Sequence, residues 1–120
     1  MHKFICSHME SNQLTNLSQE VHQLHADLCA ALADPTRILV LYQLAEAPGT
    51  VGELAGRLNV SAANMSRHLK TLRERGLVRA NRQAASVTYS LADERIINAL
   101  DTLRSVLRDT LAYRANLIAQ

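Results

Sequence analysis

The chain has 120 residues, of which 48% are hydrophobic and only 3% aromatic, so one domain with one core is expected, built of helices and not as a β-sandwich. Its net charge of +2 does not by itself indicate a polyanionic partner. The sequence has no run of about 18 apolar residues and no secretion signal, which predicts a cytoplasmic protein without a membrane partner. In that compartment Cys6 and Cys29 are expected as free thiols, metal ligands or a redox pair.

The basic residues gather in one part of the chain. Between Arg57 and Arg82 lie seven basic residues and a single acidic one, whereas the remainder carries six basic and ten acidic residues. This clustering is the electrostatic pattern expected of a face that binds nucleic acid. A solvated helix surface can produce the same pattern.

The N-terminal part predicts an arm and two helices. Residues 1–12 are polar and aperiodic, which predicts a flexible arm ahead of a domain formed by residues 13–120. A helix is expected from about Leu14, and Asp34-Pro35 ends it and begins a second helix over residues 35–47. An apolar stripe follows the first helix at alternating spacings of four and three: Leu17, Val21, Leu24, Leu28 and Ala31.

A helix-turn-helix signature follows. A short third helix opens at Thr50 or Val51, and after a short turn Ser61 has the residue type and place of an N-cap for a fourth helix that stops at Gly76. Met65, Leu69 and Leu72 share one face of that helix, and the opposite face is small and basic. The pattern predicts a recognition helix whose front enters a DNA groove.

After Gly76 the spacing of apolar residues changes from a helical period to strict alternation. Val87, Tyr89 and Leu91 alternate with polar residues and, with residues 77–78, predict two antiparallel strands joined by a tip over residues 79–86. A final helix from about Ala92-Asp93 toward Ala119 carries an apolar stripe that so small a body cannot cover. The predicted fold class is therefore mainly α with a small antiparallel β-hairpin, and it forms a homodimer through its first and last helices.

Three stretches carry a resemblance to a known family: ALADPTRILVLYQL, ELAGRLNVSAANMSRHLKTLRERGLV and VTYSLAD. Together they resemble the arsenical-resistance-repressor (ArsR/SmtB) family of bacterial winged helix-turn-helix transcription regulators, over residues 28 to about 110. The resemblance implies a homodimer that binds an inverted repeat in double-stranded operator DNA, usually as a repressor. It also implies release from the DNA by a small effector, often a metal ion or metalloid.

The front of the fourth helix supplies the candidate base contacts. Arg67 can hold guanine with two hydrogen bonds, and Asn64 can bond an adenine edge. Ala63 is small and faces forward, so it can touch a thymine methyl group.

Phosphate contacts are expected around these base contacts. Ser61 at the helix start offers a hydroxyl and a backbone N–H group, and Lys70 lies one turn further on than Arg67. Ser66 sits to the side and can reach a base or a phosphate. For Asn64 and Ser66 the alternative is packing within the helix-turn-helix.

The expected wing departs from the family pattern. A frequent Gly-Arg pair in the family lies two residues before the V-x-Y strand, where this chain has Ala84-Ala85. Wing contact with DNA is therefore expected to be weaker and to rest on Arg82 and Gln83.

The sensor sites best known in the family are mostly absent. Asp93 and Asp109 match acidic positions of its zinc site, but the histidine positions hold other residues, so Asp93 is expected to be a helix N-cap. The remaining mismatched positions are Thr50 and Gly52 in the third helix, Thr71 and Arg75 in the fourth, and Arg95 and Val106 in the last.

An alternative sensor is suggested by the first helix. His22, His25 and Cys29 lie at i, i+3 and i+7 and form one column, to which the arm can add Cys6. Imidazole and thiolate suit a transition metal ion, and thiolates suit arsenite. The competing interpretations are a solvated or structural column, a redox pair of Cys6 and Cys29, and a regulator with no sensor.

Two other functional classes fit the sequence less well. An enzyme needs an organised nucleophile, base and stabilising group, or a Gly-rich phosphate loop, and the sequence suggests none of these. A winged helix that binds protein and no longer binds DNA is an alternative, but the retained basic front argues against it.

Overall fold

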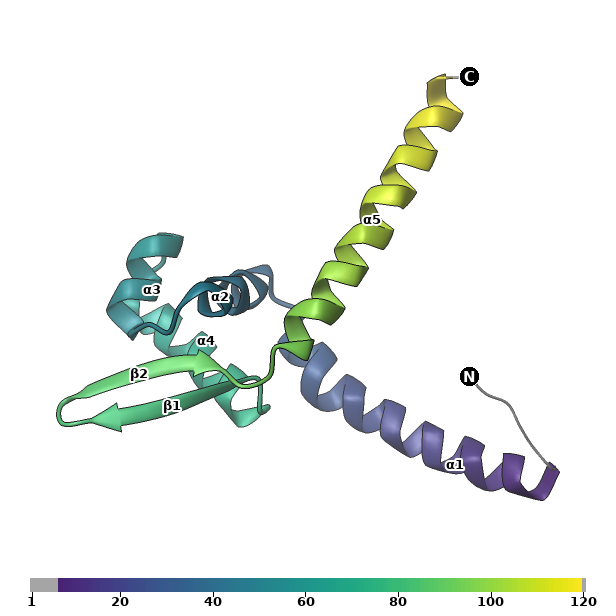
Figure 1. The fold of residues 1–120 in the computed structure, drawn as a ribbon, viewed down its shortest axis with the longest axis horizontal. Coiled ribbons are helices and arrows are strands. Elements are labelled where there is room, and N and C mark those ends of the chain that lie inside the picture. Colours follow the sequence, from purple (N-terminus) through teal and green to yellow (C-terminus); the bar gives the residue numbers. More distant parts are fainter. Residues whose placement is uncertain (1–6, 120) are drawn as a thin grey trace.

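The computed structural model describes residues 7–119, with the side chains of residues 13–119. Five α-helices and a two-stranded hairpin follow one another in the expected order (Figure 1). The first helix, α1, continues into a π-helical turn, η1, and begins earlier than the expected start near Leu14. The elements are α1 Ser7–Leu24, η1 His25–Cys29, α2 Pro35–Glu46, α3 Val51–Leu58, α4 Ala62–Glu74, β1 Val78–Gln83, β2 Ser86–Leu91 and α5 Arg95–Ala119.

Local capping fixes where the helices begin. The carboxylate of Asp34 accepts a 2.8 Å hydrogen bond from the backbone N–H of Thr36, and Pro35 occupies the first turn of α2. Thr50 and Glu53 form a reciprocal capping box at the start of α3. These bonds satisfy donors that a helix cannot pair internally, so the chain turns sharply at both places.

One core joins α2, α3, α4 and the hairpin. Its buried members are all apolar, and partly buried side chains of the hairpin and of the start of α5 pack around them. The core consists of Ala31, Val40, Leu41, Leu44, Leu54, Ala55, Met65, Leu69, Leu72, Leu77, Val78 and Leu100. Because α4 contributes three fully buried residues to this core, its opposite face is turned to solvent in a fixed direction.

The hairpin is fastened to the body through β2. Its strands pair from Val78 opposite Leu91 to Gln83 opposite Ser86. Gly49 and Tyr89 exchange two backbone hydrogen bonds of 3.0 and 2.8 Å, which fasten β2 to the segment before α3. The expected tip over residues 79–86 is too long, and that prediction is wrong, because only residues 84–85 lie outside the strands.

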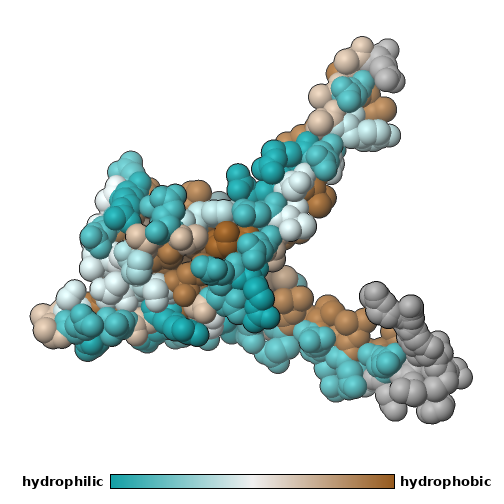
Figure 2. Space-filling view, in the orientation of Figure 1, coloured by the Kyte–Doolittle hydropathy of each residue, from teal (hydrophilic) through white to brown (hydrophobic). Residues whose placement is uncertain are grey.

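Two helical arms leave the body. In Figure 1, α1 and α5 diverge from one corner of the molecule. The Cα radius of gyration is 18.7 Å, whereas a compact chain of this length has about 14 Å. Brown, hydrophobic patches lie along both arms in Figure 2. The exposed large apolar side chains of the arms are Leu14, Leu17, Val21 and Leu24 on α1, and Leu103, Val106, Leu107, Leu111, Tyr113, Leu117 and Ile118 on α5. No helix among residues 7–119 is long and apolar enough to cross a membrane.

Candidate nucleic-acid interface

The turn between α3 and α4 is built from two local signals. Asn59 adopts the left-handed conformation with φ of 56°, and the N–H of Val60 donates to the Ala55 carbonyl at 3.1 Å. The Ser61 hydroxyl, two residues after Asn59, accepts a 3.1 Å hydrogen bond from the backbone N–H of Asn64 and so caps α4. The expected N-cap role of Ser61 is confirmed, and the turn fixes how α4 is presented.

The front of α4 is exposed along the expected set of residues. Met65, Leu69 and Leu72 on the back of the helix are fully buried. The side chains expected to meet DNA lie in solvent on the other side: Ser61, Ala63, Asn64, Ser66, Arg67 and Lys70. The helix therefore presents a small, polar and basic surface that is free of apolar core contacts.

Two of these front residues contact each other. Nη2 of Arg67 donates a hydrogen bond to the Oδ1 oxygen of Asn64, one turn earlier on the same face. The two residues lie at i and i+3, a spacing at which helical side chains are neighbours.

His68 lies half-buried beside this front. Burial raises the pKa of nearby Asp34, but the N–H of Thr36 and the charges of His68 and Arg37 outweigh it and lower that pKa overall. The charge of His68 thus contributes to lowering the pKa of Asp34 at the start of α2.

The end of α4 is a Schellman motif. The N–H of Leu77 donates to the Leu72 carbonyl at 2.9 Å and that of Gly76 donates to the Arg73 carbonyl at 3.0 Å, with φ of 79° at Gly76. The glycine supplies a conformation that other residues adopt only at a cost. The predicted stop at Gly76 is confirmed.

The hairpin of β1 and β2 forms the wing, and polar residues expected to contact DNA lie near its tip. Arg82 pairs with Val87 and Gln83 with Ser86, and both Arg82 and Gln83 are exposed. Ala84 in the tip has φ of 54°, an unfavourable value for a residue with a Cβ atom. Arg79 is also exposed on β1, and its charge helps to lower the pKa of Asp93. It is a further basic residue of the wing, outside the DNA contacts expected from the sequence.

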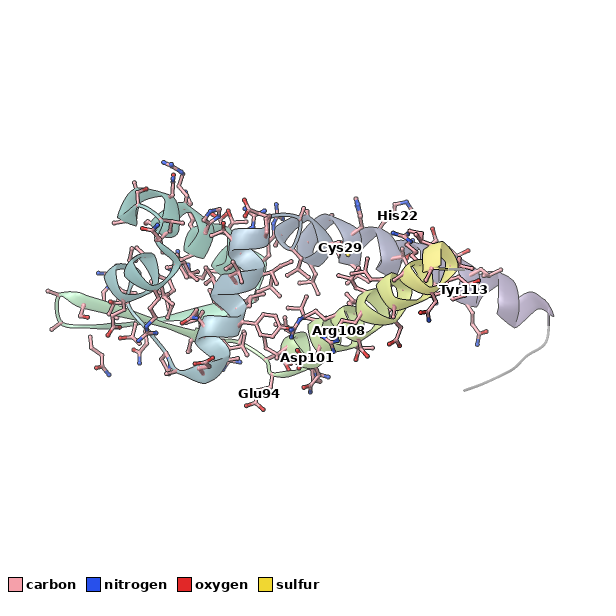
Figure 3. The ribbon with its side chains drawn as sticks, turned by 90° about the horizontal axis from the view of Figure 1, so that it is seen from above. His22, Cys29, Glu94, Asp101, Arg108 and Tyr113 are labelled. Atoms are coloured by element: carbon pink, nitrogen blue, oxygen red, sulfur yellow. The ribbon has the colours of Figure 1, made fainter. Side chains whose placement is uncertain are left out.

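The first helix and its π turn carry the described candidate sensor residues. His22 and Cys29 project from the first helix and its π turn (Figure 3), and Cys29 is a free, exposed thiol. Nδ1 of His22 lies 2.6 Å from the Ser18 carbonyl. The described side chains contain no group of three or more histidine, cysteine or acidic residues placed to hold a metal ion. Cys6 lies outside the described residues, so the proposed set of Cys6, His22, His25 and Cys29 stays a prediction.

The positions on α5 that match the family's zinc site do not suit a metal. Arg95 at a histidine position donates to both carboxylate oxygens of Asp93, with Nη2 at 2.7 Å from Oδ2. The Arg95 side chain and its backbone N–H lower the pKa of Asp93 to about 2. Oδ1 of Asp93 also accepts the backbone N–H of Arg95 at 2.9 Å, so Asp93 caps the start of α5, as expected, and its carboxylate is already paired with arginine.

A polar cluster that sequence spacing did not reveal joins α2 to α5. The Tyr42 hydroxyl donates to Oδ1 of Asp101 at 2.6 Å, and the Arg104 guanidinium lies 5.2 Å from the centre of the Tyr42 ring. Asp101 is labelled near the base of α5 in Figure 3. Burial and the Asp101 hydrogen bond raise the pKa of Tyr42. The cluster holds the α5 arm against the body.

These features define a winged helix-turn-helix DNA-binding protein. A family model described as a bacterial regulatory protein of the arsR family matches residues 34–80, which span α2 to the start of β1. The transcriptional regulator CmtR of Mycobacterium tuberculosis is 42% identical over 82 residues, which cover 68% of this chain and 70% of CmtR. The chain belongs to the arsR family of bacterial transcriptional regulators.

Solved structures agree with this assignment. The crystal structure of Rv0081 from M. tuberculosis superimposes with a TM-score of 0.71 at 34% identity and covers 79% of this chain and 96% of that one. A homodimeric winged helix-turn-helix DNA-binding domain, Mb0332 of Mycobacterium bovis, gives a TM-score of 0.70 at 25% identity over 80% of this chain and 88% of that one. The chain is a DNA-binding transcriptional regulator, in agreement with the expectation that it is no enzyme.

Proposed function

We propose that the protein binds an inverted-repeat operator as a homodimer and represses transcription by occupying it. The observation that carries the proposal is the exposed, basic front of α4, held in a fixed direction by three fully buried residues on its back. In a dimer two such helices would enter successive major grooves about 34 Å apart.

The front residues divide into readers and anchors. Arg67 offers two parallel donors that match O6 and N7 of guanine, and Ala63 can lie against a thymine methyl group. Ser61, Ser66 and Lys70 surround them at the helix entry and one turn on, where phosphates pass. Arg82 and Gln83 would reach the backbone or minor groove from the wing.

A binding titration tests this proposal. Fluorescence anisotropy would compare the protein's own upstream DNA with a shuffled duplex over a range of salt concentrations. Arg67→Ala is expected to cost about 1–3 kcal/mol on the operator and to relax base choice, whereas Lys70→Ala weakens both duplexes equally. Equal affinity of the parent for both duplexes would contradict sequence-specific regulation. Absence of binding to either duplex would favour the protein-interaction alternative.

The homodimer is supported by the two uncovered arms. Leu107 and Leu111 remain 56% and 50% exposed on α5, and apolar residues of α1 are exposed in the same way. Such stripes are stable in water when a second copy covers them.

A matched pair of variants tests the dimer. Leu107→Asp is expected to give monomers by light scattering, because it places a charge in the apolar stripe. Ser105→Asp adds the same charge on another side of α5 and is expected to stay dimeric. Dimers of both variants would place the interface elsewhere.

For the effector we propose a thiol-reactive signal at the first helix. Cys29 is exposed and free, and His22 and His25 precede it. A transition metal ion or arsenite would bind these groups with Cys6, or an oxidant would take two electrons and two protons from Cys6 and Cys29 and leave them joined by a disulfide. Titrating the reduced protein–DNA complex with zinc, cobalt, arsenite or diamide separates these modes. Unchanged DNA affinity throughout, in the parent and in Cys29→Ser alike, would eliminate both.

A further inference from the structure

We propose that Asn64 is a positioning residue that holds the Arg67 guanidinium in place for the guanine it reads. The inference rests on the proposed function, in which Arg67 contacts a base. Its basis is the hydrogen bond from Nη2 of Arg67 to Oδ1 of Asn64. Specificity at that base pair then belongs to the two residues together.

The donors and acceptors of the pair are compatible with this role. An arginine side chain has five N–H donors and needs two of them for guanine, so donation to Asn64 leaves enough for a bidentate contact. None of the described carboxylates forms an ion pair with Arg67. Asn64 is therefore the group that orients the guanidinium before DNA arrives.

Preorganisation explains why such a contact affects binding. A long exposed arginine loses side-chain freedom when it docks on a base, and a contact formed in the free protein lowers that loss. Asn64 itself is held at the first turn of α4, because its backbone N–H donates to Ser61. That bond uses the main chain, so replacing the Asn64 side chain leaves the helix cap intact.

The competing role for Asn64 is direct reading of adenine. That role requires the amide Nδ2 donor as well as the Oδ1 acceptor, whereas orientation of Arg67 requires only the acceptor. Asn64→Asp keeps an oxygen acceptor for Arg67, now part of a carboxylate, and removes the amide donors. Asn64→Ala removes both, so the two substitutions separate the roles.

The experiment is a double-mutant cycle on base preference. Each operator base pair is substituted in turn, and the ratio of dissociation constants is measured for the parent, Arg67→Ala, Asn64→Ala, Asn64→Asp and the Ala/Ala double variant. The position where Arg67→Ala loses discrimination is the Arg67 base pair. Circular dichroism and melting confirm that every variant folds.

Asn64→Ala is expected to reduce guanine preference at the Arg67 base pair roughly three- to tenfold and to have no further effect in the Arg67→Ala background. Asn64→Asp is expected to retain that preference, although added negative charge lowers affinity for all duplexes uniformly. The inference would be overturned if the losses of guanine preference in Asn64→Ala and Arg67→Ala added up in the double variant. It would also be overturned if both Asn64 variants lost discrimination at a different base pair. Either result would leave the proposed function standing. Unchanged discrimination in Arg67→Ala would overturn the inference together with the role of Arg67 as a base reader, whereas equal affinity of the parent for all duplexes would overturn the proposed function.

Discussion

Nη1 of Arg75 lies 3.0 Å from Oδ1 of Asp27 and joins the end of the recognition helix α4 to the π turn of the first helix. Gln23 donates to the other carboxylate oxygen of Asp27 at 2.5 Å. A single carboxylate thus ties the DNA-binding helix to the arm proposed to carry both the dimer contact and the effector.

The Asp27–Arg75 pair is expected to add little to stability. Both side chains are partly exposed, at 36% and 45%, so the coupling free energy from a cycle of Asp27→Asn and Arg75→Met should stay below about 1 kcal/mol. Urea unfolding in low and high salt measures it, and the coupling should shrink as salt rises. A coupling that salt leaves unchanged would show that the pair is not a screened surface contact.

Gly76→Ala is expected to destabilise the protein by about 1–2 kcal/mol, because its φ of 79° is costly for a residue with a Cβ atom. A Cβ atom there would meet nothing within 4 Å, so backbone strain is the whole effect. Gly56→Ala in α3 is the matched control, since a Cβ atom there also meets nothing within 4 Å. It should stabilise by about 0.5–1 kcal/mol. Thermal melting of both variants checks the opposite signs, and equal signs would refute the argument.

Ala84→Gly in the wing tip is expected to stabilise the protein by up to about 1 kcal/mol. Its φ of 54° already lies in the left-handed region, where glycine carries no steric penalty. Ala85→Gly is the control and should be neutral or destabilising, because Ala85 does not have a positive φ. Chemical denaturation decides the matter, and a less stable Ala84→Gly variant would show that the tip is not strained.

Acid should weaken the cap of α5 in a defined window. The hydrogen bonds from the Arg95 side chain and backbone lower the pKa of Asp93 from 3.8 to about 2. A depressed carboxylate pKa adds stability above its unfolded value and loses it as the pH falls through the folded value. Asp93→Asn should therefore be less stable than the parent at pH 7, and the difference in stability should shrink steadily as the pH falls from about 4 through about 2. Unfolding curves across this range check it, and a difference that at pH 2 is still as large as at pH 7 would contradict the assignment.

The recognition helix could be delimited from sequence because its signals are local. Ser61 as a cap, the apolar spacing of Met65, Leu69 and Leu72, and the glycine at position 76 each act within a few residues. The structure confirms all three. The expected exposure of the basic front followed from the same periodicity.

Long-range contacts could not be predicted in this way. Tyr42 and Asp101 are 59 residues apart, and Asp27 and Arg75 are 48 apart, so no spacing rule connects them. The π turn of the first helix has no sequence signature either. The sequence pattern predicts strands that are shorter than the observed ones. The reason is that both faces of the hairpin end are exposed, so no apolar alternation marks the strands there. By contrast, the Asn64–Arg67 contact lies at a helical i, i+3 spacing and was within reach of the sequence.

Selection of duplexes from a random DNA library by the purified, reduced protein tests most directly whether α4 reads DNA. We expect enrichment of an inverted repeat whose half-sites lie about one helical turn apart. We also expect Arg67→Ala to enrich a repeat with relaxed choice at one guanine in each half-site. Enrichment of no common sequence by the parent protein, despite a folded dimer, would contradict the assignment of α4 as the element that reads DNA.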